Sequence, residues 1–287
     1  MTGGDSLVLA RDDLAAASLE GLVRADRYER TIVMQVVAPV APILSGPDAE
    51  AEQLDQLLFG EIFESLETKR GFTWGQARRD GYVGYVALAA LSENINSPSH
   101  WVSALRTYAY AQPTIRSPAI GPVSLNALVT IAEESGPFAL APGLGWLPGA
   151  HLTAIGRTMV EPAAVVERFL GAAYLWGGRD SLGLDCSGLV QQALYACGLS
   201  CPRDTGLQQF LGAPAPRSAL RRGDLVFWRG HVGMMLDARR LAHANAHHMA
   251  VAVEPLVQAV RRIARSGGGR PTAFRRPLPR GLDHAGE

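Results

Sequence analysis

Residues 176–198 read WGGRDSLGLDCSGLVQQALYACG, and this stretch predicts a helix with a cysteine at its first position. Asp185 is a residue type that favours the N-cap, so that Cys186 becomes the first residue inside the helix. Apolar residues then recur at helical spacing up to Gly198, which suits the end of a helix. A sulfur at this position faces the positive end of the helix dipole, which favours the nucleophilic thiolate. We therefore predict that Cys186 is a nucleophile and that first-turn amides bind the oxyanion formed on an attacked carbonyl.

Two histidines further along the chain are candidates for the base that a cysteine nucleophile needs. His231 begins the run HVGMMLD, and His243 follows in the run RLAHANA. A hairpin with its turn centred on Asp237 would bring the two imidazoles opposite each other on one face of a sheet. His231 would then take the thiol proton and return it to the leaving amine, while His243 would orient His231. The histidines have no acidic partner at a regular spacing, so neither a metal nor another cofactor is expected.

The sequence around these residues predicts an α+β domain over residues 158–278, with residues 279–287 as a C-terminal tail. Pro162 favours the first turn of a helix, which the run AAVVERFLGAAYLW would continue as far as Trp176. After the cysteine helix come four strand-like runs, DLVFW, HVGMMLD, RLAHANA and MAVAVEPL. Helices followed by an antiparallel sheet are typical of an α+β fold.

The residues before this domain predict two small β barrels preceded by an N-terminal arm. The arm, residues 1–30, holds a short helical pattern near residues 11–22. Residues 31–96 and 97–157 each contain short apolar runs broken by glycine, proline and serine, a texture typical of small barrels. Both stretches end in a glycine–aromatic–aliphatic triplet and a later leucine at the same offset: Gly84-Tyr85-Val86 with Leu91, and Gly145-Trp146-Leu147 with Leu152. Two tandem copies of one barrel explain this repeat, and a single larger irregular β domain is the alternative.

The composition allows two or three domains and favours neither a nucleic-acid nor a membrane partner. The chain has 287 residues, of which 27 are basic and 27 acidic, so the formal net charge is zero. Its sequence has no run of about 18 apolar residues, and a membrane-spanning helix is therefore not expected. The N-terminus lacks a basic start followed by an apolar run, and there are three cysteines, of which Cys197 and Cys201 are expected to be structural. These features favour a reducing compartment, and the expected location is the cytoplasm.

Two longer runs resemble the NlpC/P60 family. Residues 172–209 contain DCSG, and residues 220–244 contain GDLVFW, HVGMML and HA in the family's order. The resemblance implies a papain-like fold and a Cys-His-His site made of Cys186, His231 and His243. It also implies cleavage of the bond between γ-D-glutamate and a diamino acid such as diaminopimelate in the stem peptides of peptidoglycan. The endings of the two predicted barrels resemble bacterial SH3 domains, in which a strand of this pattern closes the barrel.

Family members that join SH3 domains to this catalytic domain prefer peptides with a free N-terminal L-Ala, which implies turnover of soluble murein peptides in cell-wall recycling. Selective binding of a free ammonium needs carboxylates in a partly closed pocket. Asp185 and Ser187 match family positions that serve this purpose. The family also uses an acid and a tyrosine of the first SH3 domain, which we assign to Glu61 and Tyr82. A strand-end acid and a core tyrosine are the alternative roles of this second pair.

Four further residues are candidates for the wall of the cleft. Tyr174 and Trp176 precede a glycine pair that lets the backbone approach a substrate. Asp204 and Thr205 match a family segment that borders the active site. Ordinary packing of the two aromatic residues, and helix capping by Asp204 or Thr205, are the alternatives.

The expected partners are murein-derived peptides, with neither nucleic acid nor membrane among them. The sequence determines neither the oligomeric state nor the diamino acid that is accepted. Two other functions remain open: a papain-like amidase or acyltransferase that uses the same Cys-His pair on another amide or ester, and a wall-binding protein whose catalytic domain has decayed. A free-amine-binding acid at the cleft would favour the peptidase over the amidase. The presence of Cys186, His231 and His243 favours an enzyme over the decayed protein.

Overall fold

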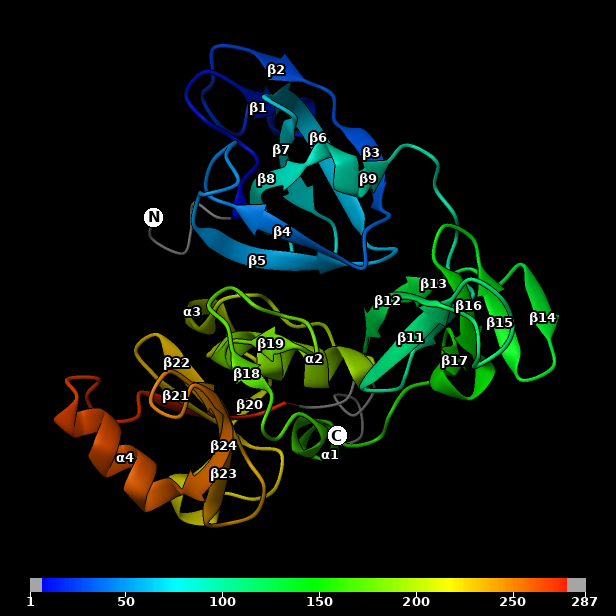
Figure 1. Ribbon diagram of the computed structural model, residues 1–287. Coiled ribbons are helices and arrows are strands. Elements are labelled where there is room, and N and C mark those ends of the chain that lie inside the picture. The colour runs from blue at the N-terminus through cyan, green and yellow to red at the C-terminus, as the bar shows by residue number, and fades with distance from the viewer. Residues whose placement is uncertain (1–6, 278–287) are drawn as a thin grey trace, which may run out of the picture. The chain divides into compact units, whose positions relative to one another are not determined.

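The computed structural model describes residues 7–277, and the chain forms two compact units, one ending at Ile155 and the other beginning at Gly156 (Figure 1). This division lies close to residue 158, the predicted start of the α+β domain. Within the described residues, the first unit is built from strands and 3₁₀ turns, and the second contains the α-helices.

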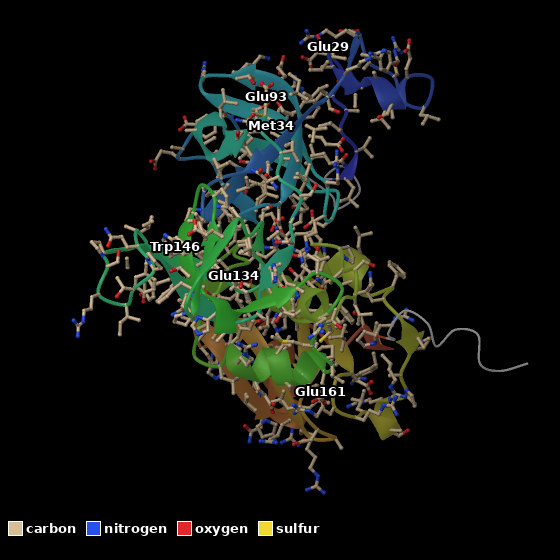
Figure 2. All side chains as sticks on the ribbon, turned by 90° about the vertical axis from the view of Figure 1, so that its right-hand side faces the viewer. Glu29, Met34, Glu93, Glu134, Trp146 and Glu161 are labelled. Atoms are coloured by element: carbon tan, nitrogen blue, oxygen red, sulfur yellow. The ribbon has the colours of Figure 1, made fainter. Side chains whose placement is uncertain are left out.

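The first sheet of the first unit has seven strands in the order β5-β4-β8-β7-β6-β3-β9. Its strands are β3 (Ile32–Val36), β4 (Val40–Leu44), β5 (Gln53–Leu58), β6 (Ile62–Lys69), β7 (Phe72–Ala77), β8 (Val83–Ala87) and β9 (Leu91–Ser92). Alternate side chains point to one side, where Ile43, Leu57 and Phe63 are fully buried in a single core. Met34 of β3, labelled in Figure 2, belongs to the same core.

The described part of the N-terminal arm contains no α-helix, so the helix predicted near residues 11–22 is wrong. The segment forms two short parallel strands and a 3₁₀ turn: β1 (Ala15–Ala16), β2 (Tyr28–Glu29) and η2 (Ala17–Leu19). Leu9 and Leu14 are buried in a cluster with Trp74 of the first sheet. These contacts outweigh the local preference because a helix of this length is marginal without tertiary support.

Two further sheets complete the first unit, with the orders β13-β10-β17 and β12-β11-β16-β15-β14. Their strands are β10 (His100–Val102), β11 (Arg106–Tyr110), β12 (Ala119–Ser124), β13 (Leu128–Val129), β14 (Glu133–Ser135), β15 (Phe138–Ala141), β16 (Gly145–Pro148) and β17 (Leu152–Ala154). The core between them takes in Leu58 and Phe59 from the end of β5, so the two halves of this unit share one hydrophobic cluster.

The repeated triplet has the same local structure in both halves of the first unit. The strand that holds it is followed by a 3₁₀ turn and a short strand: β8, η3 (Leu88–Ala90) and β9 in one half, and β16, η4 (Gly149–His151) and β17 in the other. Trp146, labelled in Figure 2, takes the aromatic position of the second triplet. This likeness agrees with the hypothesis of two copies, while the identity of the second half as an SH3-like barrel stays a prediction.

The second unit begins with a helix that is shorter than predicted. Its helices are α1 (Pro162–Arg168), α2 (Cys186–Ala196), α3 (Thr205–Gln208), η5 (Arg217–Ala219) and α4 (Leu256–Arg265). The predicted continuation of α1 to Trp176 is wrong, because Gly171 adopts a φ of 81° and turns the chain into the strand β18 (Ala173–Tyr174). This strand pairs with β19 (Gly183–Leu184) and β24 (Ala250–Pro255), so its residues satisfy their backbone hydrogen bonds in a sheet instead.

An eight-stranded sheet, in the order β19-β18-β24-β23-β22-β21-β25-β20, fills the rest of the second unit. The four predicted strands are confirmed as β21 (Leu225–Trp228), β22 (His231–Met235), β23 (Arg240–Asn245) and β24 (Ala250–Pro255), and β20 (Ala213–Pro214) and β25 (Ala273–Arg276) extend one edge. Helix α4 packs Ala259 against Val226 and Leu241 of the sheet. Among the described residues, no helix is both long enough and apolar enough to cross a membrane.

Candidate active site

Helix α2 begins as the sequence predicts, with Asp185 at the N-cap and Cys186 at the first helical position. The Asp185 carboxylate accepts a hydrogen bond from the backbone N–H of Gly188 at 2.7 Å, which satisfies one of the first-turn amides. A side chain at position 188 would collide with the carbonyl oxygen of Gly178, because a Cβ built there lies 2.3 Å from it. Glycine is thus required at Gly188 for close packing of the helix against the preceding loop.

The sulfur of Cys186 lies beside the turn that joins β21 to β22. Its Sγ is 4.0 Å from the carbonyl oxygen of Gly230, the residue directly before His231. The backbone of Val232, the residue directly after His231, also forms a hydrogen bond with this sulfur. Cys186 is only 8% exposed. The fold therefore brings the start of α2 to the start of β22, where His231 is located.

Burial raises the pKa of the Cys186 thiol to about 12, and the neighbouring Asp185 carboxylate acts in the same direction. Hydrogen bonds from the backbone of Val232 and Ser187, and the charge of Arg203, act against this rise. The position at the helix start favours a thiolate, whereas burial and the charge of Asp185 favour the protonated thiol. With a pKa of about 12, the resting Cys186 is a thiol, and it would have to lose its proton to attack a carbonyl.

His231 and His243 are in direct contact, as predicted, although the hairpin register differs from the predicted one. The Nε2 atom of His231 lies 2.7 Å from Nδ1 of His243. The pairs Met234–Ala242 and Met235–Leu241 centre the turn one residue later than Asp237, so the histidines are diagonal neighbours instead of directly opposed. The expected turn centre is therefore wrong, and the contact survives because diagonal residues of a pleated sheet share a face and long side chains span them.

Both histidines are neutral at physiological pH. Burial lowers the pKa of His231 to about 3, and the adjacent His243 adds to this effect. Burial also lowers the pKa of His243 to about 4, while the carboxylate of Glu254 opposes the shift. A neutral imidazole is the form that can accept the thiol proton, so His231 is in the correct state to act as a base.

Sequence reasoning missed two residues behind the histidine pair. The Nε2 atom of His243 lies 2.8 Å from a carboxylate oxygen of Glu254, and the guanidinium of Arg262 donates to the same oxygen. Glu254 is on β24 and Arg262 on α4. A usable signal was present, since Glu254 is the only acid in the otherwise apolar strand run MAVAVEPL.

Glu254 is an acidic partner of the histidines, which the sequence was not expected to provide. Ligand atoms of His243, His248 and Glu254 lie within 4.8 Å of one another. Two of these groups, His243 and Glu254, already bond to each other, and Arg262 brings a positive charge to the carboxylate. This arrangement fits a hydrogen-bonded chain better than a cation site.

Asp185 and Ser187, predicted to bind the substrate ammonium, take part in a buried network. Arg203 donates to both carboxylate oxygens of Asp185, at 3.0 and 2.6 Å, and to the hydroxyl of Ser187 at 2.7 Å. The hydroxyl of Ser187 and the backbone N–H of Gly177 donate to Asp185 as well. The carboxylate thus has a structural function, and its binding of an ammonium stays a prediction.

The other predicted wall residues of the second unit differ in their surroundings. Tyr174 is half-buried, and burial raises its pKa to about 12, with the charge of Asp185 acting in the same direction. Trp176 is 61% exposed. Asp204 is at the N-cap of α3 without a side-chain capping bond, and Thr205 is the first residue of that helix.

Glu61 and Tyr82 belong to the first unit, where both side chains are buried. Glu61 accepts a hydrogen bond from the backbone N–H of Leu58 at 3.1 Å and forms an ion pair with Arg79 at 2.6 Å. Tyr82 is 7% exposed and belongs to the core of the first sheet. Their structural roles are thus established within this unit, and their assignment to the substrate cleft stays a prediction.

A thiol at the start of a buried helix, next to a hydrogen-bonded pair of neutral histidines, is typical of cysteine hydrolases. Residues 171–262 match the NlpC/P60 family, and residues 43–91 match the bacterial dipeptidyl-peptidase Sh3 domain. The chain therefore contains an NlpC/P60 domain together with a bacterial SH3 domain.

Individual relatives agree with this assignment. The chain is 28% identical to a gamma-D-glutamyl-L-lysine dipeptidyl-peptidase of Bacillus subtilis, over 47% of this chain and 50% of that protein. It is 27% identical to dipeptidyl-peptidase 6 of Lysinibacillus sphaericus, over 73% of this chain and 86% of the relative. The match thus spans about half the length of the first relative and most of the second.

A solved structure shows the same fold. The crystal structure of an NlpC/P60 family protein from Bacillus cereus superposes with a TM-score of 0.72 and 20% sequence identity. The match covers 86% of this chain and 100% of that one. At this identity, the similarity establishes the fold alone.

Proposed function

We propose that this protein is a cysteine endopeptidase that hydrolyses the bond between γ-D-glutamate and a diamino acid in murein peptides. Its proposed substrates are soluble stem peptides with a free N-terminal L-Ala, with diaminopimelate as the diamino acid, and its proposed role is cell-wall recycling. The 2.7 Å contact between His231 and His243, beside Cys186 at the start of α2, carries this proposal. This geometry lies within the part of the chain that matches the NlpC/P60 family.

The proposed reaction has two stages, the formation of a thioester on Cys186 and the hydrolysis of that thioester. His231 accepts the proton of the Cys186 thiol while the sulfur attacks the scissile carbonyl carbon. The C–N bond then breaks, and the same proton passes from His231 to the leaving amine. A water molecule, deprotonated by His231, hydrolyses the thioester and restores the thiol.

Two features of the site support acyl transfer in this proposal. The helix dipole of α2 and its first-turn amides stabilise negative charge on the attacked carbonyl oxygen. The N–H of Gly188 is already bonded to Asp185 and that of Ser187 to the sulfur, so the amide of Cys186 is the proposed donor. Because thiol and imidazoles are all neutral at rest, charge develops only in the transition state, where the dipole stabilises it.

The names of the relatives support the proposed substrate class. One relative is a gamma-D-glutamyl-L-lysine dipeptidyl-peptidase, and another is a dipeptidyl-peptidase. An enzyme that releases a dipeptide must recognise a free amino end, which agrees with the proposed preference for unblocked L-Ala. The first name specifies L-lysine, so lysine is the alternative to the proposed diaminopimelate.

The test is incubation of the full chain with L-Ala-γ-D-Glu-diaminopimelate, the corresponding L-Lys peptide, and N-acetylated forms of both, followed by mass spectrometry. The expected result is release of L-Ala-γ-D-Glu from the free diaminopimelate peptide and little cleavage of the acetylated ones. Cys186→Ser serves as the matched inactive control. Failure of the wild type to cleave either free peptide would remove the proposed function, and equal cleavage of acetylated peptides would remove the free-amine preference.

A further inference from the structure

The histidine pair continues into a hydrogen-bonded chain that ends at helix α4. His231 contacts His243 at 2.7 Å, His243 contacts Glu254 at 2.8 Å, and Arg262 donates to the same Glu254 oxygen. The chain passes through three adjacent strands, β22, β23 and β24, before it reaches the helix. Both nitrogens of His243 and Nε2 of His231 thereby have a defined partner.

We propose that Glu254, held by Arg262, is a positioning residue that fixes the tautomers of both histidines and so keeps the proton-accepting nitrogen of His231 bare. The inference rests on the proposed function, because it assigns this network to the same Cys-His site. Neither residue touches the nucleophile in this scheme. Glu254 and Arg262 affect His231 only by fixing the tautomer of His243.

The tautomers follow from the order of donors and acceptors. An ionised carboxylate can only accept, so Nε2 of His243 must carry its proton and donate to Glu254. In a neutral imidazole the other nitrogen, Nδ1, is then bare and must accept from Nε2–H of His231. Since His231 is neutral as well, its Nδ1 is left without a proton. Nδ1 is therefore the atom that accepts the thiol proton of Cys186.

The opposite direction of the hydrogen bond between the two histidines is excluded, because it would set lone pairs of His243 and Glu254 against each other. If Nδ1 of His243 donated to His231, Nε2 of His243 would be bare and would face the carboxylate of Glu254 at 2.8 Å. Two acceptors at that distance have no hydrogen between them, and a buried contact of this kind is costly. His243 has no exposed surface and Glu254 is only 9% exposed, so water offers little relief.

Arg262 keeps the glutamate in its accepting form. Its guanidinium, together with the hydrogen bond from His243, holds the pKa of Glu254 below its usual range despite partial burial. Strand pairing sets the geometry, because Glu254 lies opposite Leu241 and His243 lies two residues further along β23, on the same face. Helix α4 packs on that face through Ala259, which brings Arg262 within reach.

The charged and titratable groups that act on the two histidines come from several neighbouring elements. They are Asp185 before α2, Glu254 on β24, His248 after β23 and Arg262 on α4. The outer side of Glu254 and Arg262 lines an open pocket of about 620 Å³, whose further basic residues are His247, Arg261 and Arg265. Glu254 raises the pKa of both histidines, and Arg262 lowers both.

The opposite effects of Glu254 and Arg262 on the histidine pKa values give a test, because a merely structural role would not shift the pH profile in opposite directions. Glu254→Gln keeps the shape of the side chain but removes its negative charge, which should lower the pKa of both histidines. The acid limb of the pH profile of kcat/KM should therefore move to lower pH. Arg262→Met should move the same limb to higher pH. Because Gln can also donate to Nε2 of His243, it permits the wrong tautomer, and kcat should fall by a factor of about 10 to 100 with KM little changed.

A matched pair of controls exists in the same unit. Glu167 and Arg222 form a bidentate ion pair whose side chains are 38% and 32% exposed, and neither residue belongs to the network. Glu167→Gln and Arg222→Met should leave kcat and the acid limb unchanged. A shift of the limb in the same direction for Glu254→Gln and Arg262→Met would overturn the proposal.

A second readout works without activity and without a variant. Nitrogen-15 shifts of the histidine rings in the full wild-type chain report which nitrogen carries the proton. The expected result is the Nε2–H tautomer for both His231 and His243. An Nδ1–H tautomer on either ring overturns the positioning role, even if peptide cleavage is observed. If the rings show the expected tautomers and no peptide is cleaved, the proposed function fails and the positioning network stands.

Discussion

The guanidinium of Arg203 lies against the carboxylate of Asp185 in a two-pronged ion pair, with N–O distances of 3.0 and 2.6 Å. Arg203 is 2% exposed, so the pair lies inside the second unit. Asp185 also accepts hydrogen bonds from Gly177 and Gly188. One carboxylate therefore joins the loop before α2, the first turn of α2 and the segment after it, and it fixes the backbone that carries Cys186.

Arg203→Ala should destabilise the second unit by about 3–5 kcal/mol, because it leaves a buried carboxylate without its cation. Hydrogen exchange of the α2 amides in the full chain measures this loss of stability at the helix that Asp185 caps. Arg222→Ala is the matched control, since its partly exposed ion pairs should contribute only about 0–1 kcal/mol. Equal loss of protection in the two variants would show that the buried pair has no special role.

Cys186→Ser should reduce kcat by a factor of about 10³ or more while the fold persists, because the hydroxyl is a much weaker nucleophile than the thiol. His231→Ala should have an effect of similar size. His243→Ala should reduce kcat less, since water can partly replace an orienting partner. Steady-state kinetics with far-ultraviolet circular dichroism as the folding control checks the order, and equal losses for the two histidines contradict this division of roles.

The stability of the second unit should depend on pH between about 6.5 and 3. Both histidines have folded-state pKa values, about 3 and about 4, that lie below the ordinary value of 6.5. The unfolded chain therefore binds more protons in this window, and stability rises with pH. The full contribution is present above about pH 6.5. It is lost as the pH falls through 4 for His243 and through 3 for His231.

Urea denaturation of the full chain at several pH values measures this slope. The His231→Asn and His243→Asn variants should each show a smaller slope between pH 6.5 and 4, whatever their absolute stability. His100→Asn, in the first unit, is the matched control and should leave the slope unchanged. An unchanged slope in both active-site variants would mean that the histidines are not buried in neutral form.

Alkylation of Cys186 by iodoacetamide at pH 7 should be slower than that of an unfolded thiol and should accelerate toward alkaline pH. The reason is the pKa of about 12 that burial and Asp185 impose on this thiol. Peptide mapping separates its rate from those of Cys197 and Cys201, and the same reaction in urea provides the reference. Fast alkylation at pH 7 in the folded chain would indicate a resting thiolate–imidazolium pair instead.

Local sequence signals predicted the elements that carry the site. Asp185 indicates the start of a helix because its side chain can cap the first turn. The structure contains this capping hydrogen bond. The strand runs that hold His231 and His243 were recognisable because β-branched and apolar residues are bounded by turn residues. Their contact followed from the two-residue repeat of a strand, which tolerates a one-residue error in the turn centre.

Other expectations failed where long-range contacts override local preference. The run after Pro162 has helical character, yet backbone pairing of Ala173 with Ala250 ends the helix early. The arm near Leu14 folds against Trp74 without forming a helix. In both places a short segment gains more from an existing sheet than from its own hydrogen bonds.

The sequence by itself determined that a helix starts at Cys186 and that two strands carry His231 and His243, because caps, strand periods and turns depend on neighbouring residues. Only the tertiary structure decided which charges complete the site. Arg203 reaches Asp185, and Glu254 reaches His243, across segments that the sequence pattern does not pair. Burial then sets the protonation state of Cys186, since the loss of hydration raises its pKa at a position where the helix dipole favours the thiolate.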